Sequence, residues 1–475
     1  MGVGLVAGVD CSTQATKVLV VDVETGRVVA SGRAPHEVTG TGGARETDPR
    51  AWWTALRDAL STTGRARQVR AISVAGQQHG LVVLDEHREP LRPAVLWNDT
   101  RSAPDAARLL ADLGGADRWA AMAGSIPTVS FTVTRWAWLR RVDPDIAGAV
   151  RHVRLPHDYL TERLSGHAVT DRGDASGTGW WSTITGDYLP EVLDHVHLER
   201  RMLPEVLGPF EVAGTVTKAA AADLGLAPGT LVGPGTGDNA GAALGLGLAP
   251  GEPVISLGTS GTAYTVSTRP AADPTGTVAG FADASGRYLP LAATLNCTLA
   301  VDRFAAWLGM DREAVEPSVG VTALPYLDGE RTPYLPTASG VVVGLRHGTP
   351  PGAILMAAYE GAVASLIDAL DALEEHSSGI DPGAPLVLIG GGSKGQAWRE
   401  VTARLSGRPL LIPASEEHVA LGAAVQAAAI LTGAGPAEIA SAWKTRQGVE
   451  VEPVPRDTET LERIRALVNG VREGR

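Results

Sequence analysis

Two similar strand–turn–strand patterns, about half the chain apart, constrain the fold of this sequence most strongly. In the first, an apolar strand reaches Asp10, a turn of small and hydroxyl residues follows, and a second apolar strand covers residues 18–21. In the second, residues 256–262 (SLGTSGT) carry the same kind of turn before an apolar strand over residues 263–266. Each pattern is typical of a β-hairpin. We therefore expect two similar halves whose hairpins face each other across a cleft.

The length of the chain and the order of its elements predict two α/β domains. A chain of 475 residues exceeds the usual size of one domain. Apolar strands alternate with amphipathic helices, which favours helices packed on a sheet. We expect a first domain over residues 1–247 and a second over residues 248–475. The last amphipathic helix, over residues 456–472, could pack back on the first domain.

Composition and charge narrow the class of protein. Hydrophobic residues make up 44% and charged residues 20% of the sequence, as in soluble globular proteins, and the net charge of −12 is spread along the chain. This argues against nucleic acid or an anionic membrane as a partner, because such proteins present basic surfaces. No signal-peptide pattern or uncharged apolar run of about 18 residues occurs. With only Cys11 and Cys297, neither a disulfide framework nor a cysteine metal site is expected. The sequence predicts a cytoplasmic protein.

Both turns have the composition of a phosphate-binding loop. Successive backbone N–H groups in such a turn can converge on an anion, hydroxyl groups add donors, and small side chains let phosphate oxygens approach. Either turn alone would be interpreted as an ordinary hairpin turn, but two in repeated positions favour phosphate binding. The candidate residues are Ser12, Thr13, Gly258, Thr259, Ser260 and Gly261.

Four polar residues at predicted strand ends could carry chemistry. Asp10 ends the first strand, where its carboxylate could hold Mg²⁺ against ATP phosphates or could simply cap the turn. Asp238 precedes a small-residue helix and could be a general base for a sugar hydroxyl or an N-cap. Gln78 and His79 also follow a strand and could contact a polyol. No second ligand stands at metal spacing from His79.

Taken together, these motifs resemble those of the FGGY carbohydrate kinases, over nearly the whole chain. Each motif is weak alone, but their order and spacing are specific. The motifs are residues 75–80 (AGQQHG), 96–99 (LWND), 155–160 (LPHDYL), 237–240 (GDNA), 256–261 (SLGTSG), 329–333 (GERTP), 388–392 (LIGGG) and 420–424 (ALGAA). Within the family, the resemblance is strongest to the branch that phosphorylates xylulose.

The resemblance implies two actin-like (ribonuclease H-like) ATPase domains flanking a central cleft, with ATP and Mg²⁺ as cofactors and a homodimer as a plausible assembly. Asp238 would accept the proton of the sugar's terminal hydroxyl, and Asp10 would belong to the loop that handles Mg-ATP. The other implied contacts fall into two groups. The sugar would contact Gln78, His79, Asp238, Asn239 and Trp97, the last of which could equally be a core residue. The nucleotide would contact Ser12, Thr13, Lys17, Gly258, Thr259, Ser260, Gly261, Gly391 and Gly392.

Three departures from the family pattern leave the sugar open. Gln78 stands where many of the xylulose-specific members have Met, Tyr334 where His is common, and Lys394 lies in an altered segment after the glycines. None removes a catalytic group. D-xylulose, converted to D-xylulose 5-phosphate, is the expected substrate, and ribulose, gluconate or glycerol are the alternatives.

Two other classes of protein fit parts of the sequence. Gly390, Gly392 and Gly395 satisfy the G-x-G-x-x-G pattern of dinucleotide-binding oxidoreductases, but the acidic residue expected about 20 positions later is absent. A catalytically silent sugar sensor would have the same fold, yet both Asp10 and Asp238 are retained. The sequence therefore favours a kinase.

Overall fold

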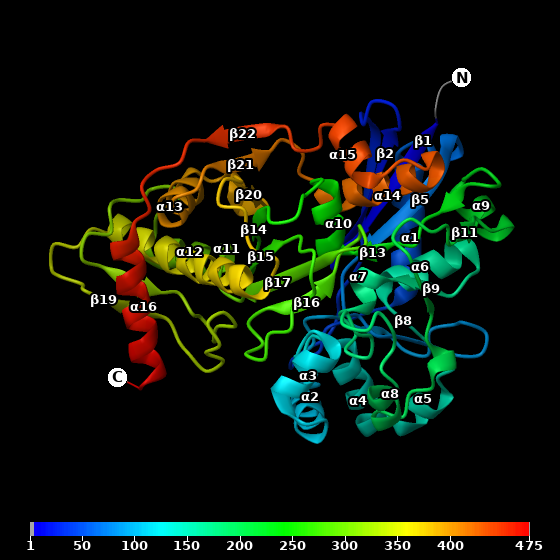
Figure 1. Ribbon diagram of the computed structural model, residues 1–475, viewed down its shortest axis with the longest axis horizontal. Coiled ribbons are helices and arrows are strands. Elements are labelled where there is room, and N and C mark those ends of the chain that lie inside the picture. The colour runs from blue at the N-terminus through cyan, green and yellow to red at the C-terminus, as the bar shows by residue number, and fades with distance from the viewer. Residues whose placement is uncertain (1–3, 475) are drawn as a thin grey trace.

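The computed structural model describes residues 4–474, which form two lobes, each built on a seven-stranded mixed sheet (Figure 1). The two sheets differ in sequence but share the same pairing scheme. The first contains β1 (Leu5–Cys11), β2 (Ala15–Asp22), β3 (Val28–Pro35), β5 (Val69–Gly76), β11 (Gly214–Thr215), β12 (Leu231–Val232) and β13 (Thr236–Gly237). The second contains β14 (Pro253–Leu257), β15 (Gly261–Thr265), β16 (Ala279–Ala282), β17 (Tyr288–Thr294), β20 (Leu386–Ile389), β21 (Leu410–Pro413) and β22 (Gly448–Val451).

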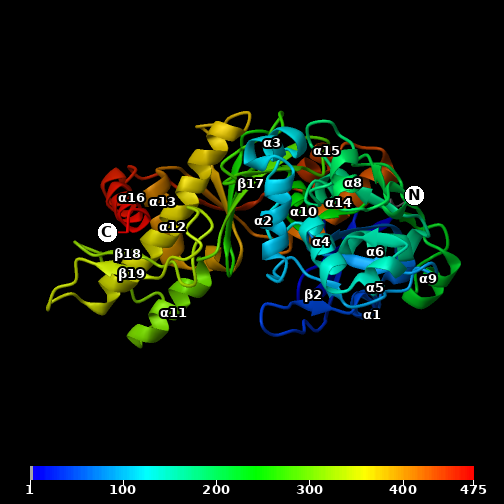
Figure 2. The same ribbon diagram turned by 90° about the horizontal axis from the view of Figure 1, so that it is seen from below.

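The order of pairings confirms the internal repeat predicted from the sequence. Along β3-β2-β1-β5-β12-β11, the pairs are antiparallel, antiparallel, parallel, parallel and antiparallel. Along β17-β15-β14-β20-β21-β22, the pairs follow the same sequence. The two predicted hairpins are β1–β2 and β14–β15, so the candidate phosphate turns occupy equivalent places in the two lobes. Figure 2 shows β17 at the junction between the lobes.

Helices and short ribbons surround the two sheets. In the first lobe the helices are α1 (Pro49–Thr62), α2 (Ala103–Asp112), α3 (Gly115–Ala123), α4 (Thr132–Val142), α5 (Pro144–Ala149), α6 (Pro156–Ser165), α7 (Arg172–Ala175), α8 (Pro190–His195), α9 (Lys218–Leu224) and α10 (Asp238–Gly245). Later helices are α11 (Thr298–Leu308), α12 (Pro351–His376), α13 (Gln396–Ser406), α14 (His418–Thr432), α15 (Pro436–Ala442) and α16 (Thr458–Arg472). The ribbons pair β4 (Glu46–Thr47) with β7 (Ala94–Val95), β6 (Val82–Leu84) with β8 (His152–Arg154), β9 (Val169–Asp171) with β10 (Glu205–Leu207), and β18 (Thr322–Leu324) with β19 (Val341–Val343).

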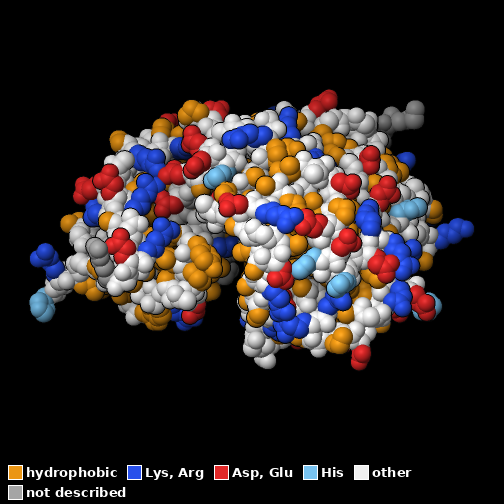
Figure 3. All heavy atoms as spheres, turned by 60° about the horizontal axis from the view of Figure 1, so that its bottom comes forward, with side chains coloured by type: hydrophobic (Ala, Val, Ile, Leu, Met, Phe, Trp, Pro, Cys, Tyr) orange, Lys and Arg blue, Asp and Glu red, His pale blue; other side chains and the backbone are white. Residues whose placement is uncertain are grey.

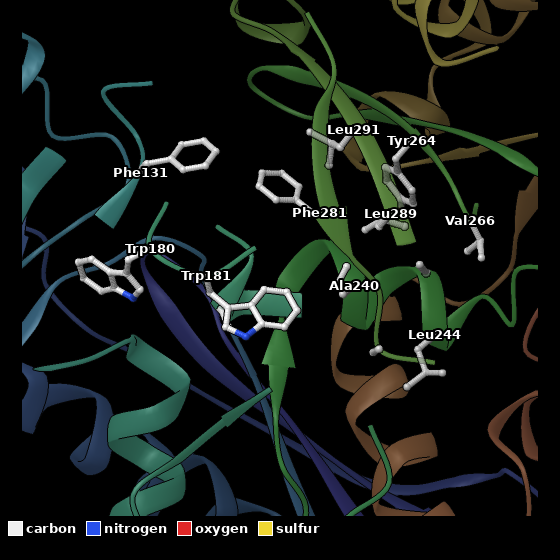
Figure 4. Close-up of a cluster of buried hydrophobic side chains, with 14 of the residues drawn as sticks. Phe131, Trp180, Trp181, Ala240, Leu244, Tyr264, Val266, Phe281, Leu289 and Leu291 are labelled. Atoms are coloured by element: carbon white, nitrogen blue, oxygen red, sulfur yellow. The ribbon is translucent and has the colours of Figure 1, made fainter. Parts of the chain in front are cut away.

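One hydrophobic core runs through both lobes. A single cluster of buried side chains joins Val6 of the first sheet to Val254 of the second and to Ala420 of α14. Figure 4 shows part of this cluster, in which Phe131 of the first lobe and Phe281 of β16 lie close together with ring centroids 6.0 Å apart. The lobes are therefore joined by packed apolar surface as well as by the chain.

The sequence predicts that the last helix could pack back on the first domain. Within residues 4–474 of the structure, α14 does so, and the last helix, α16, does not. α14 packs on β1, β5 and α10, and in Figure 1 it lies beside the N-terminal strands. α16 packs instead on α12, α13 and β18 of the second lobe. The approach of α14 needs glycine: a Cβ atom added to Gly422 would lie 1.8 Å from the carbonyl oxygen of Gly241 in α10.

Helix α12 is long and apolar enough to cross a membrane by length and composition, with a mean hydropathy of 1.5 over its best window. However, 83% of that window is buried inside the protein. Its apolar side chains, among them Leu355, Val363 and Leu366, belong to the core of the second lobe. α12 is thus a core helix of the second lobe.

We predict that Gly422→Ala destabilises the fold by roughly 1–3 kcal/mol, because the new methyl group would overlap backbone that no side-chain rotation can move. Gly470→Ala in α16 is the matched control, since a Cβ atom there meets nothing within 4 Å. That substitution should be neutral or stabilising, as Ala is the better helix former. The measurement is the urea midpoint of the first unfolding transition. Equal midpoints for the two variants would show that the α10–α14 crossing is not tight.

Candidate active site between the lobes

The carboxyl ends of three parallel strands bring the predicted polar residues to one edge of the first sheet. β1 and β13 both pair with β5, so that Asp10 and Thr236 each lie opposite Ala75. Asp10, the segment after Gly76 and Asp238 therefore share this edge. Ligands of open α/β sheets bind outside the carboxyl ends of the strands. Figure 3 shows a deep notch between the two lobes.

Asp238 is the first residue of α10 and is partly buried. The Oδ1 atom of Asp238 accepts two hydrogen bonds from Asn239, one from its backbone N at 2.8 Å and one from its side-chain Nδ2 at 3.0 Å. Burial raises the pKa of Asp238 to about 6, and these hydrogen bonds limit the rise. Near neutral pH the group is a carboxylate that still binds a proton readily, which is what a general base requires.

Gln78 and Asn239 form one hydrogen-bonded unit with Asp238. Asn239 Nδ2 also donates to Gln78 Oε1 at 3.1 Å. The contact depends on Gly237, because a Cβ atom there would lie 2.7 Å from Gln78 Cγ. The structure thus brings together three of the residues predicted from the sequence, contributed by the segment after β5 and by α10.

His79 is held as a neutral hydrogen-bond acceptor. Its backbone is left-handed (φ 67°), and its Nδ1 lies 2.7 Å from the carbonyl oxygen of Gly177. A carbonyl can only accept, so Nδ1 carries the proton and Nε2 has a free lone pair. Burial and the nearby charges of Arg135 and Arg331 lower the pKa of His79 to about 3, so the ring stays neutral. The imidazole stacks on Phe131, with centroids 5.2 Å apart.

The second lobe contributes residues to this end of the site that sequence reasoning missed. Phe281 of β16 lies 5.6 Å from the His79 ring, between centroids. Arg331 Nη2 donates to Thr128 Oγ1 of the first lobe at 3.4 Å. Arg331 belongs to a motif that was recognised, so a signal existed for it. Nothing in the sequence pairs Phe131 with Phe281.

Asp10 and Lys17 form a charged group at the end of the first hairpin. Lys17 Nζ lies 3.6 Å from Asp10 Oδ2 and 2.7 Å from Oε2 of Glu417, the residue that precedes α14. Burial raises the pKa of Asp10 to about 7, although Lys17 lowers it and Asp238 raises it further. Asp10 Oδ1 is buried and has no hydrogen-bond partner among residues 4–474. This oxygen fits a divalent cation or its water.

Trp97, in the segment after β7, contacts the first hairpin, and Ser12 and Lys17 make further contacts there. Trp97 is 36% exposed, so it is not a core residue, and its Nε1 donates to Thr13 Oγ1 at 3.1 Å. Both the backbone N and Oγ of Ser12 donate to the carbonyl oxygen of Ala15, which closes the turn. Lys17 contacts carboxylates of both lobes.

The equivalent edge of the second sheet is formed by glycines and hydroxyl residues. Thr259 is exposed at the tip of the β14–β15 turn, and Thr298 donates to the carbonyl oxygen of Gly258 at the base of the turn. The glycine loop after β20 packs directly on this turn, because a Cβ atom at Gly392 would lie 2.8 Å from Leu257 Cβ. At Gly391 a Cβ atom would meet nothing within 4 Å. The structure thus places Gly258, Thr259, Ser260 and Gly261 beside Gly391 and Gly392.

The cleft has carboxylates on one side and a turn of small and hydroxyl residues on the other. This arrangement suits a phosphotransferase, because such enzymes catalyse mainly by positioning their substrates and stabilising charge. Residues 5–245 match the FGGY family of carbohydrate kinases, N-terminal domain, and residues 254–431 match its C-terminal domain. The chain belongs to the FGGY family of carbohydrate kinases, which use ATP.

Individual relatives agree with this assignment. The chain is 60% identical to the xylulose kinase of Streptomyces rubiginosus over 466 residues, which cover 98% of this chain and 96% of the relative. Among solved structures, it is similar to the crystal structure of xylulose kinase from Bifidobacterium adolescentis, with a TM-score of 0.87 and 37% sequence identity. The match covers 98% of this chain and 99% of that one. A gluconate kinase structure from Lactobacillus acidophilus, at 22% identity and a TM-score of 0.90 over 99% and 98% of the chains, shares the fold.

We predict that the Asp238 carboxyl group titrates near pH 6 in the free protein, because burial raises its pKa. Asn239→Ala should move this midpoint upward, since the Asn239 side chain donates a hydrogen bond that stabilises the carboxylate. Asn469→Ala, an exposed change in α16, should leave it in place. The measurement is the pH dependence of the carboxyl infrared band that the wild type shows and Asp238→Asn lacks. A midpoint near the ordinary Asp value of about 4 would contradict the assignment.

Proposed function

We propose that the protein transfers the γ-phosphoryl group of ATP to O5 of D-xylulose, forming D-xylulose 5-phosphate and ADP. The observation that carries this proposal is the unit of Asp238, Asn239 and Gln78 at the cleft edge, in a chain 60% identical to a xylulose kinase. The sugar oxygen forms the new bond to phosphorus, the bond between that phosphorus and the β-phosphate oxygen breaks, and the hydroxyl proton passes to Asp238.

On the sugar side, hydrogen bonding and stacking assign the roles. Asp238 accepts the proton, while Asn239 and Gln78 fix the carboxylate and offer their own amide groups to sugar hydroxyls. The free lone pair of His79 Nε2 accepts from another hydroxyl. Trp97 offers an exposed ring at the border with the first hairpin. Gln78, in place of a residue without hydrogen-bonding groups, makes this pocket more polar.

On the nucleotide side, Thr259, Ser260 and Gly261 lie along the ATP phosphates, and Gly391 and Gly392 approach the adenosine. Ser12 and Thr13 border the phosphates from the first lobe, where Lys17 adds positive charge. Asp10 would hold Mg²⁺ through its unpartnered Oδ1. Bound there, Mg²⁺ would neutralise negative charge on the phosphates. We also propose that the domain boundary lies between residues 247 and 248 and that the enzyme works in the cytoplasm.

We expect Mg-ATP to support strong, selective ADP release with D-xylulose. The panel would compare it with D-ribulose, L-ribulose, gluconate, glycerol and a no-sugar control, each measured as kcat/KM. Hydrogen bonds to sugar hydroxyls can discriminate strongly because unpaired buried groups are costly. A higher kcat/KM for another sugar would overturn the substrate assignment and leave the kinase assignment intact.

We predict that Asp238→Asn lowers kcat by about 10²–10⁴-fold, because the amide cannot accept the hydroxyl proton. Sugar binding should stay within about tenfold, since the amide retains the size of the carboxylate and an oxygen that accepts from Asn239. Asp22→Asn, at the last residue of β2, should leave kcat unchanged. Calorimetric titration with D-xylulose and steady-state kinetics measure the two effects. A kcat near that of the wild type would exclude Asp238 as the base.

A further inference from the structure

A buried group of one histidine and three aspartates lies behind the strand that leads to Asp238. His157, in the first turn of α6, has its Nε2 3.2 Å from Asp158 Oδ1, 3.3 Å from Asp171 Oδ1 and 3.4 Å from Asp174 Oδ2. All four side chains are at most 2% exposed. None of the four is among the residues proposed to contact the sugar or the nucleotide.

The charges of this cluster are strongly coupled. Burial alone would lower the pKa of His157, but the three carboxylates outweigh it and raise the pKa to about 9, so the imidazole is a cation. Burial and the other carboxylates, Asp238 included, raise the pKa of Asp174 well above its ordinary value. Arg154 is the other cation that faces Asp158. The His157 imidazolium therefore interacts with the three carboxylates. One of these, Asp174, in turn interacts with the charge of Asp238, the proposed base.

His157 also fits directly against the backbone of both strand ends that form the sugar site. A Cβ atom at Gly235 would lie 2.4 Å from His157 Nδ1, and one at Gly76 would lie 3.1 Å from His157 Cβ. Gly235 comes just before β13 and Asp238, whereas Gly76 ends β5, two residues before Gln78. The imidazole thus occupies the space behind the two strands that lead to Gln78 and Asp238, the residues joined by the Asn239 hydrogen bonds.

A hydrogen bond ties the cluster to β13. Thr236 Oγ1 donates to Asp171 Oδ2 at 3.0 Å, and Thr236 is two residues before Asp238. Asp171 also caps α7 by accepting from the backbone N of Gly173 and Asp174. His157 contacts Asp171, and Asp171 accepts a hydrogen bond from Thr236, which only Gly237 separates from Asp238. Ion pairs buried to this extent add little net stability over apolar packing, so stability alone is a weak reason for the cluster.

We propose that His157, clasped by Asp158, Asp171 and Asp174, is a positioning residue that fixes the ends of β5 and β13 so that Gln78 and Asp238 address the same sugar molecule. This inference rests on the proposed function. His157 itself does not touch the reacting atoms. His157 thus positions residues on the sugar side of the cleft. It does not affect the nucleotide side, which is formed by β14, β15 and the glycine loop after β20.

The test compares His157→Gln, which removes the charge, with His157→Lys, which retains a cation of similar reach. We expect His157→Gln to lower kcat by at least tenfold and to raise KM for D-xylulose, while KM for ATP stays within twofold. His157→Lys should recover most of the loss. Glu360→Gln is the matched control, because it removes the charge of a buried carboxylate that pairs with Arg404 in the second lobe. It should reduce stability without changing kcat or either KM.

A second readout needs no sugar. Because the raised pKa of Asp238 comes from burial, a displaced β13 should let Asp238 titrate closer to its ordinary value in His157→Gln, by the infrared difference measurement. Thr236→Val, a milder change, should give the same direction if His157→Gln does not fold. Loss of stability in His157→Gln with unchanged kcat, sugar KM and Asp238 titration would overturn the proposal. If the wild type does not phosphorylate D-xylulose, the proposed function fails, and the Asp238 titration still decides the positioning role.

Discussion

The close crossing of α14 over α10 and β1 is the constraint on which the rest of the structure depends. Where Gly422 meets the carbonyl oxygen of Gly241, only a hydrogen atom fits between the two backbones. α10 begins with Asp238, and α14 is preceded by Glu417, which pairs with Lys17. Both helices begin at the cleft. The distance between them therefore determines where Glu417, from the second half of the sequence, lies relative to Asp10 and Asp238.

Burial, rather than any single ion pair, gives the two acidic residues of the cleft their character. Asp10 and Asp238 both have pKa values raised by desolvation, to about 7 and about 6. Their surroundings differ. Asp238 accepts hydrogen bonds from Asn239, whereas Asp10 lies beside Lys17 and has one oxygen without a hydrogen-bond partner among residues 4–474. A neutral donor orients a proton acceptor, while a free buried oxygen suits a cation. Neighbouring residues thus give these two similar groups different chemical environments, which fits the different roles proposed for them.

Much of the architecture could be predicted from the sequence because it lies in local patterns. The two hairpins and the glycine loop after β20 each occupy a few consecutive residues, and the repeat showed that they belong to equivalent sheets. The contacts between distant segments could not be predicted in this way. Nothing local distinguishes α14 from α16 as the helix that returns to the first lobe, since both carry apolar faces. The same holds for Phe131 with Phe281, and for His157, whose three partners include Asp171 and Asp174 from another ribbon and helix.

The repeated topology explains how one scaffold provides two opposite electrostatic surfaces. β1 and β14 hold equivalent places, and each leads into a hairpin turn at the cleft. Asp10 lies next to the end of β1, and the neighbouring strands end near Gln78 and Asp238, so this edge presents carboxylates that suit a cation and a proton. β14 is followed by Gly258, Thr259 and Ser260, so its edge presents backbone N–H and hydroxyl groups that suit phosphate oxygens. Phosphoryl transfer needs a surface that suits a cation and a proton to face one that suits phosphate oxygens, and two sheets with the same pairing order but different polar residues at their edges meet that need.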